Sequence, residues 1–402
     1  MKKSLFILAT AALALASCNK NEPVAKNLTL NDANEITFRT FEPKVMRAAD
    51  QTLSTLQEAD KGFYVTAYHK VGVADPVSYF DNVQFKWNAG TFVSDKKYYW
   101  PAEGTLDFFA YAPAVDNTQL TRTDYKTFTV APSTTVAEQV DLIYANTDGK
   151  SKTGAYTPVG GSASTYGAAG VPINFRHAGA KIVVKVKNSE VNDLKFEITQ
   201  MKIAHVDGSA TFTYNDAASP TGDQNTDGSG TLLVGDWTNN TSSDVSYSTA
   251  TLTTNTVTGQ ISTGQFLNGS GTLNTEDENL HMILIPQETD DVTDAYASDD
   301  DNAVYSGSYI ALKMTIKQAG SNIVIADATT ANKWAMWPVK FEWEPGKKYT
   351  YVIDLSGGGY WETNTDDGDD DLDQILEGAV IKFVDVTVDN WNTTPGETAV
   401  SM

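Results

Sequence analysis

The chain has 402 residues, a single cysteine and a formal net charge of −22. So acidic a surface argues against binding to nucleic acid or to anionic lipid headgroups, and one cysteine excludes an intrachain disulfide. Glycine is abundant, with 29 residues, and Thr, Asn and Asp separate short apolar runs. This composition is typical of strands joined by turns. The sequence therefore predicts an all-β protein that is long enough for two domains.

Residues 1–17 have the features of a lipoprotein signal peptide. A basic start at Lys2 and Lys3 precedes a short apolar run, Ser4–Ala14, which is too short to span a bilayer. The following Leu-Ala-Ser-Cys sequence, which ends at Cys18, matches the bacterial lipobox. We therefore expect cleavage before Cys18 and lipidation of its thiol, and two or more acyl chains would give a stable membrane anchor. The alternative is an ordinary signal peptide with a chance cysteine.

Strand patterns begin after a polar tether at residues 18–35. Ile36–Phe38 is a short strand candidate, and Leu53 and Leu56 fit one face of a short helix. Alternation of apolar and polar residues then recurs at Phe63–Ala67, Val83–Trp87 and Leu106–Ala110. This period predicts antiparallel strands that are buried on one face. Residues Thr147–Gly170, rich in Gly, Ser and Thr, are predicted to form a long exposed loop.

The second half of the chain shows the same alternation of apolar and polar residues, and we place a domain boundary near residue 178. Strands are predicted at Lys181–Lys187, Leu194–Ile198, Leu280–Ile285, Ile310–Ile316, Tyr349–Leu355 and Val380–Val388. A glycine triplet at 357–359 and an acidic run precede the last of these strands. The favoured architecture is two β-sandwich domains in tandem, at residues 36–178 and 179–402.

Several short segments recur together in one known family. They are the lipobox, Ile36–Phe38 followed by Arg47-Ala48, Tyr98–Pro101 leading into Leu106–Pro113, Gln139–Ala145, Phe175–Ile182, Ile285–Gln287, Trp343–Tyr349 and Val384–Trp391. In this order, over nearly the whole chain, they resemble the fimbrillins, the type V pilus subunits of Bacteroidetes, including the Mfa-like group.

The resemblance implies transthyretin-like β-sandwich domains and assembly by strand exchange. It implies that a lipid-anchored precursor reaches the outer membrane and that an Arg-specific protease then removes the first strand. Carried over to this chain, the cut falls between Arg47 and Ala48 and removes residues 36–47, in which Ile36 and Phe38 would act as a placeholder. The alternative to a cleavage site is that Arg47 is an ordinary solvated charge in a loop.

The donor strand is expected near the end of the chain, within Val380–Val388. Its candidate residues lie on two faces, with Ile381 and Phe383 on one and Val384, Val386 and Val388 on the other. The alternative is that this strand pairs inside its own domain. Few apolar residues follow Trp391, which departs from the pattern of a stalk subunit and leaves a tip, anchor or accessory position open.

No catalytic or metal-binding pattern stands out. The four histidines, among them His177, make no HExxH pair, and His177 is expected to be a packed residue. The acidic loops Asp290–Asp301 and Asp366–Asp373 do not fit an EF-hand, so solvated loops are the default reading. Trp237, Trp334 and Trp337 are expected to pack in the core or at strand edges. We expect no enzyme activity, cofactor or metal.

The leading hypothesis is therefore a structural and adhesive fimbrial subunit at the cell surface. Its partners would be other fimbrial subunits, the outer membrane through the lipid on Cys18, and an Arg-specific protease, and a receptor on a host or bacterial surface stays open. The alternative is a permanently lipidated surface lipoprotein that does not polymerise and binds glycans or acts as an adhesin.

Overall fold

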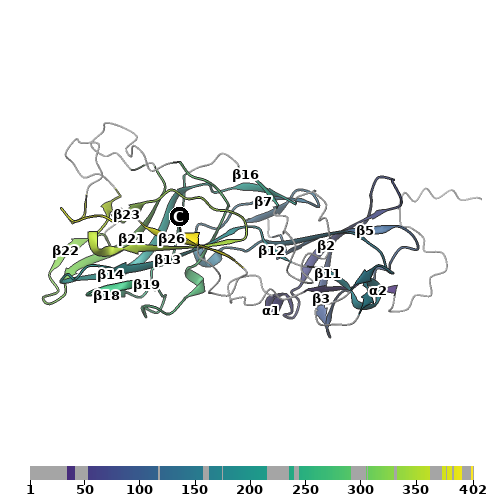
Figure 1. Ribbon diagram of the computed structural model, residues 1–402, viewed down its shortest axis with the longest axis horizontal. Helices are drawn as coiled ribbons and strands as arrows, with labels where there is room; N and C mark the ends of the chain where they lie inside the picture. The colour runs from purple at the N-terminus through teal and green to yellow at the C-terminus, as the bar shows by residue number, and fades with distance from the viewer. Residues whose placement is uncertain are drawn as a thin grey trace, which may run out of the picture.

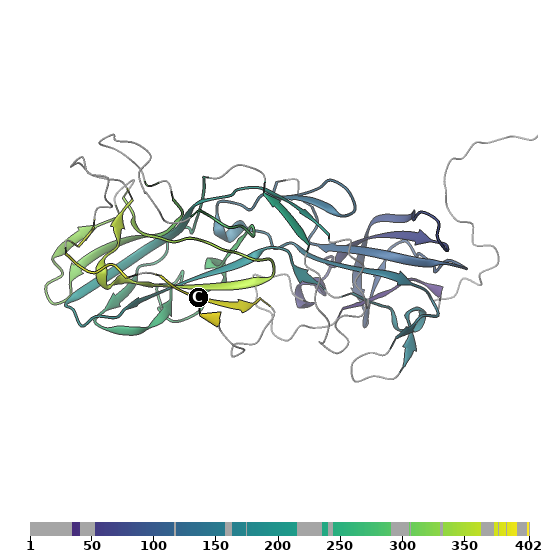
Figure 2. The same cartoon turned by 45° about the horizontal axis from the view of Figure 1, so that its top comes forward.

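The computed structural model describes residues 34–40, 53–115, 118–156, 163–173, 175–214, 235–239, 244–290, 305, 307–329, 333–362, 374–376, 378–382, 384–391 and 400–401. These parts are dominated by strands, and their α-helices, α1 (Leu53–Leu56) and α2 (Tyr166–Ala169), have four residues each. Neither helix is long enough to cross a membrane. The strands gather at two ends of an elongated molecule (Figures 1 and 2), which agrees with the predicted tandem β domains.

The N-terminal end is built on one eight-stranded sheet. Its order is β11 (Val171–Ile173), β1 (Phe38–Thr40), β4 (Thr91–Ser94), β3 (Val77–Asn88), β2 (Phe63–Lys70), β5 (Thr105–Ala112), β8 (Ile143–Lys150) and β12 (Arg176–His177). The predicted alternation is confirmed in β2 and β5, whose inward residues are fully buried. Val171 of the first strand in this order and Ile143 of the last but one share one core, so the sheet curves around that core.

The C-terminal end is a sandwich of two sheets. One contains β19 (Ile261–Phe266), β13 (Ala180–Asn188), β24 (Lys347–Asp354), β26 (Asp385–Asn390) and β27 (Val400–Ser401), with β20 (Met282–Leu284) beside β13. The other contains β17 (Val245–Ser248), β14 (Leu194–Val206), β21 (Tyr309–Gln318), β23 (Ala335–Pro338) and β25 (Tyr360–Trp361), with β18 (Asn255–Thr258) and β22 (Val324–Asp327) as side branches. Inward residues of both sheets form the largest core, as in sandwiches generally.

A four-stranded sheet joins the two ends. Its order is β16 (Asp236–Asn239), β15 (Ala210–Thr213), β7 (Thr127–Val130) and β6 (Leu120–Arg122). Phe212 stands opposite Phe128, and the Tyr214 hydroxyl donates to the carbonyl of Ala110. Strands on both sides of residue 178 therefore share one sheet, and the domain boundary at that residue stays a prediction.

Two expectations about the chain's path are wrong. The stretch Thr147–Gly170, expected to be one exposed loop, contains the end of β8, then β9 (Ala155–Tyr156), β10 (Ser164–Thr165) and α2. Tyr166 of α2 is buried in the N-terminal core, which the Gly/Ser/Thr composition did not indicate. The last strong strand begins at Asp385 rather than Val380, and the Val380 side chain is 76% exposed.

Candidate functional site

Strand β1 lies inside the eight-stranded sheet, between β11 and β4. Phe38 is the parallel partner of Val171 in β11 and the antiparallel partner of Phe92 in β4. Pairing with β11 continues through Thr40, which stands opposite Ile173. The strand that the sequence placed at Ile36–Phe38 is therefore present, with its ladder shifted toward Thr40. Because β1 satisfies the backbone of two neighbours, its departure would leave two unpaired edges.

The side chains of Ile36 and Phe38 are fully buried in the N-terminal core. The Phe38 ring lies edge-on to Phe85 and Phe108, with ring centroids 4.7 and 5.1 Å away, and a third edge contact joins it to Phe63 at 5.9 Å. Burial of such a side chain contributes about 1.5–3 kcal/mol, and each aromatic pair adds about 0.5–1.5 kcal/mol. Phe38 therefore occupies the centre of an aromatic cluster.

The residues just before β1 are held by the segment Tyr98–Trp100. The amide of Ile36 donates to the Tyr98 carbonyl at 2.7 Å, and the Trp100 amide donates to the Asn34 carbonyl at 2.9 Å. The ammonium of Lys97 lies 2.8 Å from the buried carboxylate of Glu35. The described part of this segment is therefore fastened along its length by backbone bonds as well as by its apolar side chains.

Gly170 lets β1 approach the end of α2. Its φ is +83°, a conformation that suits glycine, and the amide of the next residue, Val171, donates to the Thr37 carbonyl at 2.8 Å. A Cβ at residue 170 would lie 3.1 Å from Thr37 Oγ1 and 3.3 Å from Thr37 O. The absence of a side chain at this position therefore makes room for the segment that carries Phe38.

The C-terminal strand β26 lies second from the edge of its sheet. It pairs antiparallel with β24 from Asp385 to Asn390, and its other neighbour is the two-residue β27. The predicted donor residues Val384, Val386 and Val388 are half-buried against the C-terminal core, and Ile381 packs on the same core. The strand thus pairs within its own domain here, as the alternative expected, and its role as a donor stays a prediction.

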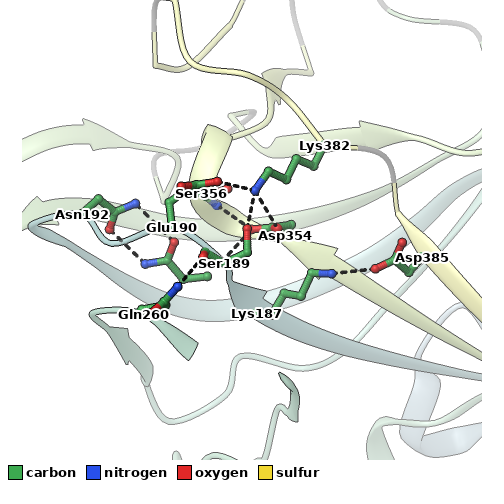
Figure 3. Close-up of polar contacts among 10 residues, drawn as sticks. Lys187, Ser189, Glu190, Asn192, Gln260, Asp354, Ser356, Lys382 and Asp385 are labelled. Carbon is green, nitrogen blue, oxygen red and sulfur yellow. Dashed lines mark hydrogen bonds and ion pairs between the residues drawn. The ribbon is translucent and has the colours of Figure 1, made fainter. Parts of the chain in front are cut away.

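A cluster of polar contacts holds the segment that leads into β26 (Figure 3). The ammonium of Lys382 lies 2.7 Å from Glu190 Oε1 and 3.6 Å from Asp354 Oδ2, and Lys187 forms an ion pair with Asp385 at 2.6 Å. Burial tends to raise the pKa of Asp354, but hydrogen bonds from Ser189 and then Ser356 outweigh it, so the pKa is lowered. We call Lys187, Glu190, Asp354, Lys382 and Asp385 the polar clasp.

The glycine triplet at 357–359 packs directly under this segment. Gly357 ends the 3₁₀ helix η4 (Leu355–Gly357), and a Cβ there would lie 2.5 Å from the Val380 carbonyl oxygen and 2.9 Å from Ile381 Cα. Backbone atoms cannot yield as a flexible side chain can. Gly357 therefore allows the chain to pass over η4.

His177 is a packed residue, as expected. Its Nδ1 lies 2.8 Å from Asp141 Oδ2, and both side chains are buried. The indole of Trp391, which directly follows β26, stacks on the imidazole. The end of the C-terminal strand thereby contacts the N-terminal sheet. Of the tryptophans expected to pack, Trp337 and Trp334 are buried.

Several predicted positions lie outside the described residues. These are Cys18, Arg47, Ala48, Phe383 and most of the acidic loops Asp290–Asp301 and Asp366–Asp373. Among the residues that are described, no group of three or more His, Cys, Asp or Glu side chains could hold a metal ion. Lipidation of Cys18, cleavage after Arg47 and solvated acidic loops stay predictions.

The sequence did not single out Gly170 or the polar clasp. A glycine directly before a strand is a weak signal for close backbone approach, and Gly170 carries that signal. No sequence signal indicates the clasp, because its residues are far apart in the chain. Lys187 and its partner Asp385, for example, are 198 positions apart. Only the fold brings these charges together.

One protein family matches this chain over most of its length. A family model described as fimbrillin-like matches residues 47–391. Solved structures similar to this chain include a candidate cell adhesion protein from Bacteroides uniformis, with 17% identity, TM-score 0.44, and coverage of 89% of this chain and 99% of that one. Another is the tip fimbrial protein Mfa3 from Porphyromonas gingivalis with C-terminal truncation, with 9% identity, TM-score 0.32, and coverage of 89% and 100%. No curated protein matches the chain.

Proposed function

The chain belongs to the fimbrillin-like family of fimbrial and adhesion proteins, and from this premise we propose that it is a structural and adhesive subunit of a surface fimbrium. Members of this family act at the cell surface and are generally not enzymes. We propose that the subunit is exported as a lipoprotein, that the lipid on Cys18 holds the precursor at the outer membrane, and that its partners are other fimbrial subunits.

Assembly would begin when an Arg-specific protease cuts between Arg47 and Ala48. The cut breaks the covalent link between β1 and the rest of the fold. The observation that carries this proposal is the position of β1 inside its sheet, with Phe38 central to the core. Loss of such a strand opens a groove with apolar walls and two unpaired edges, which a strand from another subunit can fill.

The incoming strand would come from the end of another chain, within residues 380–388. In support, β26 and β27 form the edge of their sheet and both belong to the last part of the sequence. Their departure would make β24 an edge strand without splitting the sheet, so the C-terminal sandwich keeps its two layers. Both domains are proposed to be transthyretin-like, with their boundary near residue 178.

The test is a cleavage experiment on protein that lacks residues 1–18. An Arg-specific protease should release the first strand and convert the monomer into a ladder of polymers on gels run without heating. Arg47→Ala should block this conversion, whereas Arg39→Ala, the matched control within β1, should leave it intact. A cleaved protein that stays a stable monomer would reject strand exchange and favour the permanently lipidated surface binding protein.

A further inference from the structure

The aromatic cluster around Phe38 limits which strand can replace β1. The rings of Phe63, Phe85 and Phe108 all meet the Phe38 ring, two of them at 90°. Edge-to-face contacts need a ring at the centre, and a smaller side chain there would leave a cavity, which a close-packed core tolerates poorly. The replacing strand must also bring an aliphatic residue two positions earlier, where Ile36 is buried.

The chain itself carries this pattern near its C-terminus. Isoleucine followed two residues later by phenylalanine occurs at 36–38, at 173–175 and at 381–383. The copy at 173–175 is already used, because Ile173 belongs to β11, the neighbour of β1, and Phe175 packs on the same core. The copy at 381–383 is in the segment before β26, where Ile381 and Lys382 belong to no strand.

Resting on the strand exchange proposed above, we propose that residues 381–383 of a second copy of this chain replace residues 36–38. Ile381 then takes the place of Ile36, and Phe383 takes the place of Phe38. The valine face of the strand, with Val386 at its middle, does not enter the groove, because valine cannot supply the central ring. The partner is thereby fixed as a second copy of this chain, in a stated register.

The middle residue of the pattern agrees with this register. Thr37 lies between the two buried residues and is only half-buried, so its place accepts a polar side chain. Lys382 would stand there, with its ammonium free to reach solvent. In the closed subunit Lys382 is held on the surface by Glu190 and Ser189. Exposed pairs of this kind stabilise a fold weakly, so they hold the segment in place but do not prevent it from leaving the subunit.

The register can be read with a disulfide between two copies. Arg39 is opposite Pro172 in the parallel pair of β1 and β11, and facing residues of neighbouring strands, about 4.8 Å apart, are within reach of a disulfide. If Phe383 takes the place of Phe38, Val384 stands opposite Pro172. If Val386 takes that place instead, Thr387 stands opposite Pro172. The protein without residues 1–18 has no cysteine of its own.

The experiment compares two double variants, Val384→Cys with Pro172→Cys and Thr387→Cys with Pro172→Cys. Neither variant removes a charged residue of the polar clasp, so the two are matched in their effect on it. After cleavage by the Arg-specific protease and mild oxidation, the first should give a reducible covalent ladder and the second should not. Phe383→Ala should abolish polymers, whereas Val386→Ala should preserve them.

The outcomes separate the register from the function on which it rests. A covalent ladder from the Thr387→Cys variant alone, or polymers in which neither variant forms a crosslink, would overturn the register and leave strand exchange standing. Wild-type protein that forms no polymer after cleavage would instead reject the proposed function. Polymers that survive Phe383→Ala would show that the central ring comes from elsewhere.

Discussion

The indole of Trp391 stacks on the imidazole of His177, with ring centroids 3.9 Å apart and planes 8° from parallel. Trp391 directly follows β26, whereas His177 belongs to β12 of the N-terminal sheet. The backbone amide of Trp391 also donates to the Gly346 carbonyl at 2.9 Å. The stack of Trp391 on His177 therefore connects the end of the C-terminal strand to the opposite half of the molecule. The site is buried, and Asp141 contacts it through His177 Nδ1.

Removal of the indole should loosen β26. For Trp391→Ala we expect amide hydrogen exchange in residues 385–390 to accelerate, because the strand end loses its stack and leaves a cavity, which typically costs about 3–5 kcal/mol. Exchange measured by mass spectrometry checks this. Trp391→Phe keeps an aromatic ring over His177 and should behave much more like the wild type. Equal exchange in all three proteins would mean that the stack does not hold the strand.

Truncation of Phe38 should destabilise the uncleaved protein. Phe38→Ala is expected to lower the free energy of unfolding by about 3–5 kcal/mol, because the cavity lies among the rings of Phe63, Phe85 and Phe108. Urea unfolding followed by circular dichroism gives the value. Val73→Ala, at a fully exposed side chain, is the control and should change little. A loss below about 1 kcal/mol would contradict the central packing of this ring.

A side chain at residue 170 should weaken the hold on the first strand. Gly170→Ala places a Cβ 3.1 Å from Thr37 Oγ1 in a left-handed backbone conformation. Gly90→Ala is a matched control, because its φ is also positive, at +108°, but a Cβ there meets nothing within 4 Å. The first substitution should lower the thermal midpoint more than the second. Equal shifts would mean that only backbone strain matters at residue 170.

The lowered pKa of Asp354 predicts a specific loss of stability in acid. Its carboxyl has a folded-state pKa below the ordinary 3.8, so the carboxylate stabilises the fold above pH 3.8, and this contribution is lost as the pH falls through the lower folded-state pKa. Asp354→Asn keeps an acceptor for the Ser189 amide but cannot titrate. Urea midpoints from neutral pH down to pH 2 should therefore fall less steeply in this variant, whereas Asp75→Asn, at an exposed side chain, should follow the wild type.

Local patterns predicted strands well where one face is buried along its length. In β5 the alternation from Leu106 to Ala110 directly reports which residues face the core, since period two is a property of the strand itself. The same pattern does not report how deeply each side chain is buried. Trp87 alternates in phase with the buried Phe85 but is 36% exposed, because it lies near the end of β3, where the core no longer covers it.

The failures have a different cause. Thr147–Gly170 looked like an exposed loop because its residues are small and polar, yet it carries Tyr166 into the core and ends at Gly170, against the first strand. Val380 looked like the start of a strand because it opens an apolar run, yet this segment passes over Gly357, and its described residues belong to no strand before Asp385. In both places the neighbours that decide the outcome come from distant parts of the chain.

The sequence by itself determined the all-β class, the buried faces of the long strands, the short strand at Ile36–Phe38 and the family resemblance, because each depends on residues close together in the chain. Only the tertiary structure decided that β1 lies between β11 and β4, that Phe38 is surrounded by aromatic rings, and that β26 contributes Asp385 to the polar clasp. These depend on strand order and on contacts between residues far apart in sequence, which no local pattern encodes.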